Sequence, residues 1–233
     1  MNYAIIAAGE GSRLVSEGLS TPKPLIKLNG EPMIDRLIRI FLRNRAETIS
    51  IIVNEEMTEV YQHLKGLKIP IPLHLVRKST PSSMHSFAEL ASTINTGKFC
   101  LTTVDTIFRE DEFSHYITAF ENTTSDGLMA VTDYIDDEKP LYVDVDNDLR
   151  ITDYKDQAYE NARFISGGIY CLSDKSRTTL NYCMHNNVSR MRNFQRQLIV
   201  DKLHLEAWPF KKIIDVDHTE DIEKALQFLN EEF

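Results

Sequence analysis

The sequence has few of the features that secreted, disulfide-linked or membrane-spanning proteins need. Three cysteines, Cys100, Cys171 and Cys183, stand far apart among 233 residues, inside apolar segments. Buried free thiols are therefore expected, and neither disulfides nor a cysteine metal site. No apolar run approaches the roughly 18 residues of a membrane span, and the first residues lack the basic and apolar regions of a secretory signal. These absences predict a cytoplasmic protein.

An excess of positive charge is also absent. The formal net charge is −9, which argues against nucleic acid and anionic membranes as partners. The first 45 residues are the exception, with seven basic and four acidic side chains. A locally basic segment in an acidic protein suits a small anionic ligand. The apolar helix faces do not distinguish a core from a partner, so the sequence sets no oligomeric state.

Strand and helix patterns alternate in the first half of the chain. This alternation predicts an α/β fold with a parallel sheet covered on both faces. The expected strands are Tyr3–Ala8, Thr48–Val53, Leu73–Val76 and Phe99–Val104, and the expected helices are Met33–Arg45, Glu55–Lys65 and Met84–Ile94.

The second half has a mixed pattern, without internal repeats or a linker, so residues 1–233 are expected to form one domain. Arg163–Leu172 is expected to be a strand with a glycine bulge, and Leu141–Val145 with Leu149–Tyr154 a hairpin. The other expected strands are Gly127–Asp133, Leu205–Trp208 and Ile213–Val216, and the expected helices are Asp111–Phe120, Ser173–Met184, Ser189–Leu203 and Thr219–Phe233, the last of them capped at Thr219.

A glycine-rich loop, Gly9-Glu10-Gly11-Ser12-Arg13, follows the first strand. Successive backbone N–H groups in such a loop can form a nest for an anion. Lys23 follows between two prolines, which restrict the backbone around it. The loop is neither the dinucleotide-binding fingerprint, because Leu14 replaces its third glycine, nor a P-loop. A phosphate site is favoured over a structural turn with solvated cations.

The segments Ala7-Ala8-Gly9-Glu10-Gly11-Ser12-Arg13-Leu14 and Thr21-Pro22-Lys23-Pro24-Leu25 together resemble the signature of the nucleotidyltransferase (NTP-transferase) family, of the sugar-1-phosphate nucleotidyltransferase or NDP-sugar pyrophosphorylase type. Ala8 departs from the pattern, since a second glycine is common there. The resemblance implies a three-layer, Rossmann-like (GT-A-like) fold with a mixed, mostly parallel sheet. It also implies a nucleotide-binding half at 1–120 and an acceptor-binding half at 121–233.

The resemblance further implies which residues act on a nucleoside triphosphate. Arg13 and Lys23 would be catalytic, and Ser83 and Ser86 would contact the base or ribose, although Ser82 or Ser83 could equally cap a helix. The remaining nucleotide-binding positions would be those of the loop, namely Ala7, Ala8, Gly9, Glu10, Gly11 and Ser12.

Carboxylates at two strand ends are the candidates for a Mg²⁺ site. Asp105 ends the fourth strand, where open α/β sheets place their ligands, and the family has a Mg²⁺-binding Asp there; capping of the next helix is the alternative role. The resemblance implies a second carboxylate near the C-terminus. Asp215 and Asp217 are expected to share one face of a strand, with Asp217 favoured as the direct ligand. Oxygen ligands of this kind suit Mg²⁺.

The motifs for binding the acceptor are less specific than the glycine-rich loop. Gly167 and Gly168 resemble the family's acceptor-side strand, and Lys155 matches a lysine that touches the sugar phosphate, although Asp156 departs from its usual context. The expected activity is transfer of a nucleoside monophosphate to a phosphorylated acceptor with release of pyrophosphate, as in nucleotide-sugar biosynthesis. A sugar 1-phosphate is the favoured acceptor. A cytidylyltransferase acting on phosphocholine or another phospho-alcohol, and a non-catalytic nucleotide-sugar-binding protein, remain open, and so does the base.

Two other classes fit less well. Asp215-Val216-Asp217-His218-Thr219 matches the nucleophile motif of haloacid-dehalogenase-type phosphatases, but that fold carries the motif on its first strand. Asp144-Val145-Asp146 matches the metal-binding pair of glycosyltransferases, but it falls in the expected hairpin.

Overall fold

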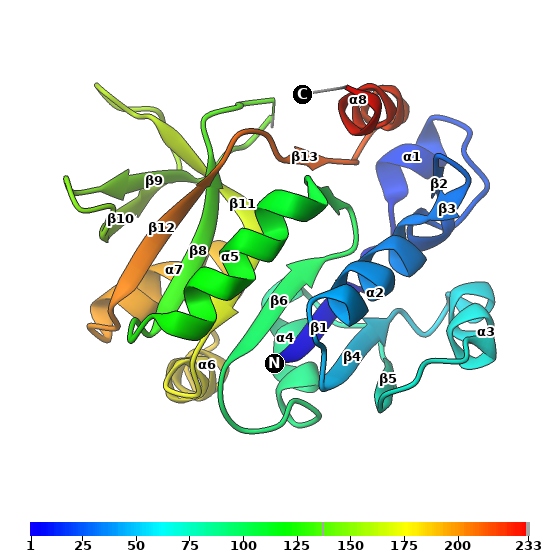
Figure 1. Ribbon diagram of the computed structural model, residues 1–233, viewed down its shortest axis with the longest axis horizontal. Coiled ribbons are helices and arrows are strands. Elements are labelled where there is room, and N and C mark those ends of the chain that lie inside the picture. The colour runs from blue at the N-terminus through cyan, green and yellow to red at the C-terminus, as the bar shows by residue number, and fades with distance from the viewer. Residues whose placement is uncertain (137, 232–233) are drawn as a thin grey trace.

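The computed structural model describes residues 1–136 and 138–231, and a nine-stranded mixed sheet runs through this part of the chain (Figure 1). Its first half is parallel. Strand β1 (Asn2–Ala7) lies between β4 (Thr48–Val53) and β6 (Phe99–Thr103), and β4 pairs with β5 (Leu73–Arg77). The parallel front half predicted from the alternating pattern is therefore confirmed.

The second half of the sheet is mixed, as predicted. Strand β11 (Phe164–Leu172) runs antiparallel to β6 and joins the two halves. It also pairs with β8 (Gly127–Thr132) and β9 (Tyr142–Val145). The remaining pairs are β9 with β10 (Ile151–Lys155), the predicted hairpin, and the parallel pair of β8 with β12 (Leu205–Phe210).

Helices cover both faces of the sheet, which gives the predicted three layers (Figure 1). One face packs against α2 (Met33–Arg43), α3 (Thr58–Gly66) and α5 (Glu110–Asn122). The other face packs against α4 (Ser83–Ala91), α6 (Ser176–His185) and α7 (Met191–Val200). A third apolar cluster joins α1 (Ser12–Ser16) to α8 (Thr219–Asn230) beside these layers.

The uninterrupted apolar run of β1 reflects its burial on both faces. Tyr3 and Ile5 point into the cluster under α2, whereas Ala4 and Ile6 point into the cluster under α4. Tyr3 stacks on Phe41 with ring centroids 4.4 Å apart, and its hydroxyl donates to the carbonyl of Asn44 at 2.8 Å. Both faces of a strand must be apolar when helices cover each side.

Several details differ from the sequence-based expectations. The long loop after β1 contains α1, a 3-10 turn η1 (Lys23–Leu25), and a short hairpin of β2 (Lys27–Leu28) with β3 (Glu31–Pro32). Helix α8 is capped by His218 rather than Thr219, and it ends at Asn230. Residues 232–233, which the predicted helix included, lie outside the described residues.

Other expectations are confirmed. Cys100, Cys171 and Cys183 are all buried free thiols. Within residues 1–136 and 138–231, no helix has both the length and the apolar character needed to cross a membrane.

The predicted glycine bulge lies in β11, where the register shifts between Ser166 and Tyr170. Gly168 has φ +73°, and a Cβ there would lie 2.9 Å from Oγ1 of Thr106. A Cβ on Gly167 would lie 2.3 Å from Cδ1 of Ile213. Both glycines therefore allow close backbone approach, and they let β11 lie against the segments on which the candidate site is built.

We predict that Gly168→Ala lowers the free energy of unfolding by about 1–3 kcal/mol, because the new Cβ meets Thr106 in a left-handed backbone region. Chemical denaturation measures the change. Gly66→Ala is the matched control, since a Cβ on Gly66 meets no atom within 4 Å. Equal stability of the two variants would contradict this explanation.

Candidate active site

Two short strands outside the main sheet bring the predicted carboxylates together. Strand β7 (Thr106–Ile107) pairs antiparallel with β13 (Ile214–Asp215). The pairing continues for one more hydrogen bond, from the Val216 amide to the Asp105 carbonyl at 3.1 Å. Asp105 and Asp217 therefore flank the same small ladder, although more than 100 residues separate them in the chain.

Lys23 lies between these two carboxylates. Its Nζ is 2.5 Å from Oδ2 of Asp105 and 2.7 Å from Oδ1 of Asp217, and the lysine side chain is 8% exposed. Burial alone would lower the pKa of Lys23, but the two carboxylates outweigh it and raise that pKa above its ordinary value. Burial would likewise raise the pKa of Asp105, but the Lys23 ammonium holds it below its ordinary value. Lys23 and Asp105 are therefore both charged at neutral pH.

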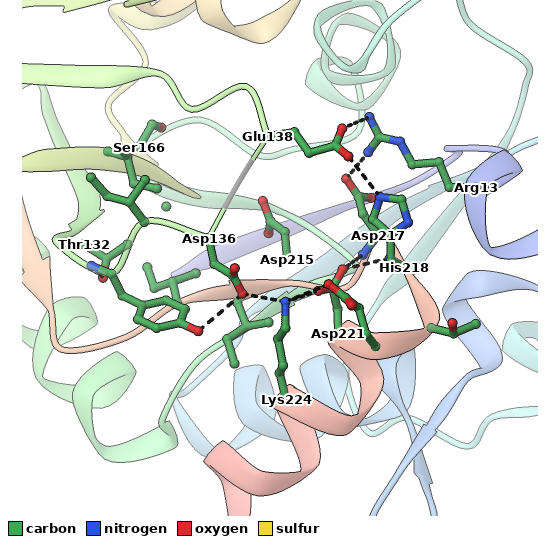
Figure 2. Close-up of a pocket in the computed structure, with 18 of the residues that line it drawn as sticks. Arg13, Thr132, Asp136, Glu138, Ser166, Asp215, Asp217, His218, Asp221 and Lys224 are labelled. Carbon is green, nitrogen blue, oxygen red and sulfur yellow. Dashed lines mark hydrogen bonds and ion pairs between the residues drawn. The ribbon is translucent and has the colours of Figure 1, made fainter. Parts of the chain in front are cut away.

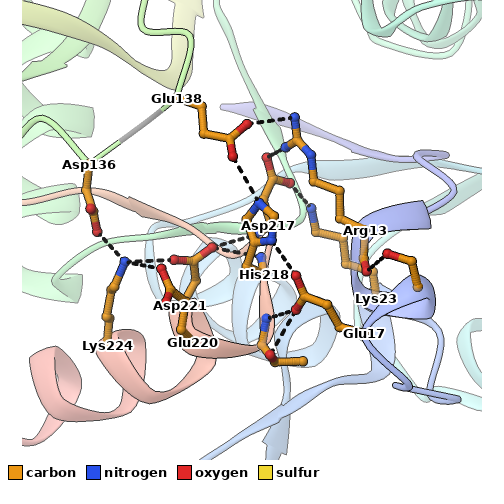
Figure 3. A network of polar contacts seen from close by, with 12 residues as sticks. Arg13, Glu17, Lys23, Asp136, Glu138, Asp217, His218, Glu220, Asp221 and Lys224 are labelled. Carbon is orange, nitrogen blue, oxygen red and sulfur yellow. Dashed lines mark hydrogen bonds and ion pairs between the residues drawn. The ribbon is translucent and has the colours of Figure 1, made fainter.

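Arg13, on α1, contacts the other oxygen of the Asp217 carboxylate (Figure 3). Its Nη1 donates to Oδ2 of Asp217 at 2.7 Å, and its Nη2 lies 3.5 Å from Oε2 of Glu138. The two predicted catalytic cations thus share Asp217, one on each carboxylate oxygen. An arriving anion would compete with Asp217 for both of them.

Gly11 is required where the glycine-rich loop turns toward Lys23. Its φ is +61°, and a Cβ at this position would lie 3.2 Å from Cβ of Lys23. A side chain would therefore strain the backbone and crowd the lysine. At Gly9, in contrast, an added Cβ would meet no heavy atom within 4 Å, so the space beside Gly9 would admit a ligand.

A cleft of about 580 Å³, here named the loop cleft, opens over the glycine-rich loop. Most of the predicted nucleotide-binding residues line it, but Ala7 does not, because it is a buried residue of β1. The predicted residues in the lining are Ala8, Gly9, Glu10, Gly11, Ser12, Arg13, Lys23, Ser83, Ser86, Asp105 and Asp217.

Sequence reasoning missed four polar residues of the loop cleft, namely Asn54, Ser79, Thr80 and Thr103. Asn54 directly follows β4, and its Oδ1 accepts a hydrogen bond from the Ser79 hydroxyl at 2.9 Å. The rule that located Asp105, that ligands gather at the carboxyl ends of parallel strands, also applies to Asn54. Ser79 and Thr80 lie in a loop without a recognisable pattern.

Helix capping, the alternative role that the sequence left open for Ser82 and for Asp105, is found for neither side chain. Ser82 precedes α4, but in the described structure its hydroxyl makes no capping bond and instead contacts Nδ1 of His85 at 2.8 Å. Ser86 is buried, with its hydroxyl 2.6 Å from that of Thr80. The residue that precedes α5 is Arg109 and not Asp105.

A second cavity of about 650 Å³, here named the α8 cavity, lies beside the loop cleft (Figure 2). Arg13 and Asp217 line both spaces, so the two spaces meet at these side chains. Gly167, which was predicted to bind the acceptor, and Asp215, which was predicted as a metal ligand, also line the α8 cavity. The lining residues that sequence reasoning missed include Glu17, Asp136, Glu138, His218, Asp221 and Lys224.

Asp215 and Asp217 are not related by strand alternation, contrary to the expectation from the sequence. Strand β13 ends at Asp215, and the Asp217 amide then turns back to donate to the Asp215 carbonyl at 3.2 Å. Asp215 accepts a 3.3 Å hydrogen bond from Thr106 and faces the α8 cavity. Only Asp217 of the two also lines the loop cleft.

Lys155 and Gly168, both predicted to bind the acceptor, lie outside the linings of the loop cleft and the α8 cavity. The Lys155 ammonium is 2.8 Å from Oδ2 of Asp144 and 4.0 Å from the centroid of the Tyr159 ring. Gly168 packs against Thr106, as described above. The structure therefore does not bring Lys155 together with Lys23, Asp105 and Asp217, whereas Gly168 lies against the strand that directly follows Asp105.

The carboxylate pair fits a Mg²⁺ ion that is completed by a substrate. In the described part of the chain, no group of three or more His, Cys, Asp or Glu side chains is arranged to hold a metal by itself. Protein-bound Mg²⁺ commonly uses one or two carboxylates, with phosphate oxygens and waters for the remaining positions. Asp105 and Asp217 converge on one cation, Lys23, and have this donor chemistry.

The nucleotide-binding signature, the mixed sheet and this cluster define a nucleotidyltransferase-type domain. The chain belongs to the family of the MobA-like NTP transferase domain, whose model matches residues 3–162. The family predicted from the loop motif is thereby confirmed.

Two curated relatives share part of the sequence. The 2-aminoethylphosphonate cytidylyltransferase of Lancefieldella rimae is 44% identical over 52 residues, 22% of this chain and 21% of the relative. Bifunctional protein GlmU of Thermodesulfovibrio yellowstonii is 25% identical over 181 residues, 74% of this chain and 38% of the relative. The chain therefore spans well under half the length of these relatives.

Solved structures confirm the fold. The inositol-1-phosphate CTP transferase of T. maritima superposes with a TM-score of 0.82 at 16% identity, covering 99% of this chain and 96% of that one. A putative glucose-1-phosphate thymidylyltransferase of Bacillus anthracis gives 0.84 at 17% identity, with coverages of 100% and 97%. At this level of identity the similarity establishes the architecture alone.

We predict that Lys23→Met lowers the free energy of unfolding by about 1–3 kcal/mol at pH 7, because two carboxylates then face each other without their shared cation. The low pKa of Asp105 stabilises the wild type above the unfolded pKa, and this stabilisation is lost as pH falls through the lower folded value. The deficit of the variant should therefore shrink on acidification.

Urea unfolding at pH 7, 5.5 and 4 tests this expectation. Lys27→Met serves as the control, because Lys27 is exposed. A deficit that stays constant over this pH range would contradict the assigned ion pair.

Proposed function

We propose that this protein is a Mg²⁺-dependent nucleotidyltransferase that moves a nucleoside monophosphate from an NTP to a phosphorylated acceptor, with a sugar 1-phosphate as the favoured acceptor. The observation that carries the proposal is the position of Lys23, held between Asp105 and Asp217 where the loop cleft approaches the α8 cavity. Family membership and the signature loop support it.

The loop cleft would bind the triphosphate. Backbone amides of the loop from Gly9 to Ser12, together with Arg13, would hold the β- and γ-phosphates, since consecutive amides and a guanidinium both favour anions. Lys23 would neutralise charge that gathers around the α-phosphate. Positioning and charge neutralisation supply most of the catalysis in phosphoryl transfer, so a covalent nucleophile on the protein is unnecessary.

The acceptor would approach from the α8 cavity. One of its phosphate oxygens forms a new bond to the α-phosphorus, in line with the bond to the bridging oxygen that breaks, and pyrophosphate leaves. Asp105 and Asp217 would hold Mg²⁺, which when bound neutralises charge on the triphosphate and orients it. Arg13 and Lys23 would then exchange Asp217 for phosphate oxygens.

A second candidate acceptor is one that carries a positive charge beside its phosphate or phosphonate. Seven carboxylates line the α8 cavity. The lining has fewer basic side chains, among them Arg13 and Lys224. Such a lining favours an ammonium group by Coulombic attraction. The locally similar relative from Lancefieldella rimae is named for an aminophosphonate substrate and a cytidine nucleotide, which supports a cytidylyltransferase as the alternative. The seven carboxylates are Glu17, Asp136, Glu138, Asp215, Asp217, Glu220 and Asp221.

We predict that Asp105→Asn and Lys23→Met each lower kcat by about 10²–10³-fold, the loss typical of one positioned charge-stabilising group. Continuous measurement of pyrophosphate release with Mg²⁺ gives the rate. Asp111→Asn and Lys27→Met are the controls, because both side chains are exposed, and they should retain wild-type turnover. Wild-type rates in Asp105→Asn or Lys23→Met would refute the proposed mechanism.

We predict that a matrix of four NTPs against phosphorylated acceptors yields one strongly preferred pair. Glucose 1-phosphate and glycerol 3-phosphate represent acceptors without an amine, and phosphocholine and 2-aminoethylphosphonate represent cationic ones. If the acidic lining selects an ammonium, Asp136→Asn should raise KM for the cationic acceptors by about 3–30-fold, an effect of roughly 1–2 kcal/mol.

The same substitution should leave KM for the NTP unchanged, because Asp136 lies outside the lining of the loop cleft. Preference for glucose 1-phosphate would favour the sugar-phosphate assignment. Nucleotide binding without turnover for every acceptor would favour a non-catalytic binding protein.

A further inference from the structure

We propose that Glu17 is a positioning residue, which fixes Asp217 relative to the glycine-rich loop while the substrates occupy the site. This inference rests on the proposed function. It concerns three residues here named the clasp: Glu17 at the end of α1, and His218 with Thr219 at the start of α8 (Figure 3).

Both oxygens of the Glu17 carboxylate are used in the clasp. Oε2 accepts hydrogen bonds from the Thr219 amide at 2.7 Å and from the Thr219 hydroxyl at 2.8 Å. Oε1 lies 2.5 Å from Nδ1 of His218. The first amides of a helix have no partner within the helix and favour a negative charge. Glu17 supplies that charge from a segment about 200 residues away in the chain.

The clasp joins the two segments that carry the reacting groups. Arg13 and Glu17 lie four residues apart at the ends of one short helix, and Asp217 directly precedes His218. The same two segments are therefore tied twice, once through Arg13 and Asp217 and once through Glu17. The second tie involves groups that, in the proposed reaction, hold neither the triphosphate nor Mg²⁺.

The clasp can hold Asp217 in place because its hydrogen bonds do not depend on Arg13 or Lys23. In the proposed reaction Arg13 and Lys23 turn to phosphate oxygens, so their ion pairs with Asp217 are lost. The backbone of Asp217 lies beyond the two-residue strand β13, and its amide donates to two near neighbours in the chain, the Asp215 carbonyl at 3.2 Å and Oδ2 of Asp221 at 3.1 Å. The clasp would then be a direct polar tie that still joins α1 to this segment, beside the apolar packing of Leu14 in the third cluster.

Other observations agree with this role. Thr219 was predicted from the sequence to cap α8, but its hydroxyl donates a hydrogen bond to Glu17 instead. The hydrogen bond with His218 lowers the pKa of Glu17 to about 2, so the carboxylate is charged throughout the neutral range. Reactive groups displaced by about 1 Å can cost on the order of 10²-fold in rate, so a tie at this place bears directly on turnover.

The test compares Glu17→Ala and Glu17→Gln with Glu223→Gln, an exposed substitution on the same helix α8. We expect Glu17→Ala to lower kcat/KM for the NTP by about 10–100-fold. Glu17→Gln should recover most of this loss, because its amide oxygen still accepts the Thr219 amide. Glu223→Gln should match the wild type. Equal activity of Glu17→Ala and the wild type would overturn the inference.

A double-mutant cycle with Asp217→Asn separates positioning from a general structural effect. If Glu17 acts through Asp217, Glu17→Ala should change kcat/KM less than twofold in the Asp217→Asn background, because the group that it positions is already lost. A loss as large as in the wild-type background would show that Glu17 acts independently of Asp217, and would overturn the inference.

A binding readout keeps the clasp distinguishable from the proposed reaction. Electron paramagnetic resonance can measure the affinity for Mn²⁺ in the presence of saturating NTP, without any turnover. Glu17→Ala should weaken that affinity by about threefold or more, and Glu223→Gln should not. If the wild type releases no pyrophosphate with any acceptor yet shows this Mn²⁺ effect, the proposed reaction fails and the clasp stands. Unchanged Mn²⁺ affinity in Glu17→Ala refutes the clasp.

Discussion

The arrangement of the candidate site depends on one buried ammonium group. Lys23 is 8% exposed, and Asp105 and Asp217, which lie within hydrogen-bond distance of its Nζ, keep its pKa above the ordinary value despite this burial. Desolvation of an unpaired ammonium would favour the neutral amine, while the two carboxylates would repel each other without it. The ammonium and the two carboxylates therefore stabilise one another, and together they specify how η1, β7 and the segment before α8 must meet.

The fold was readable from the sequence to a large extent, because burial on both faces forces a strand to be apolar throughout. Tyr3–Ala8, Thr48–Val53 and Phe99–Val104 show such runs, and the structure has strands there. The mixed second half followed from the hairpin around Asp146 and from the glycines of β11. The short elements after β1 were missed, because two-residue strands and one-turn helices leave no periodicity to detect.

The site could be predicted from the sequence only where its residues belong to a local motif or stand at the end of a strand. Arg13, Lys23 and Asp105 belong to recognisable local patterns, and the structure places them together with Asp217. The residues that sequence reasoning missed belong to no such local pattern. Glu17, Glu138 and Lys224 reach the α8 cavity through tertiary contacts between segments far apart in the chain, and no local spacing encodes such contacts. The family model itself matches residues 3–162, so Asp217 lies beyond the part that it describes.

The contacts of Asp217 with Arg13 and Lys23 join residues that lie far apart in the chain, and this affects when the candidate site can form. Arg13 and Asp217 are 204 residues apart, and Lys23 and Asp217 are 194 apart. Such non-local contacts form late in folding, because the entropy of closing the long loop must be offset first. A nascent chain emerging from the ribosome would present the glycine-rich loop long before Asp217 exists. The candidate site would thus be complete only after synthesis has passed Asp217.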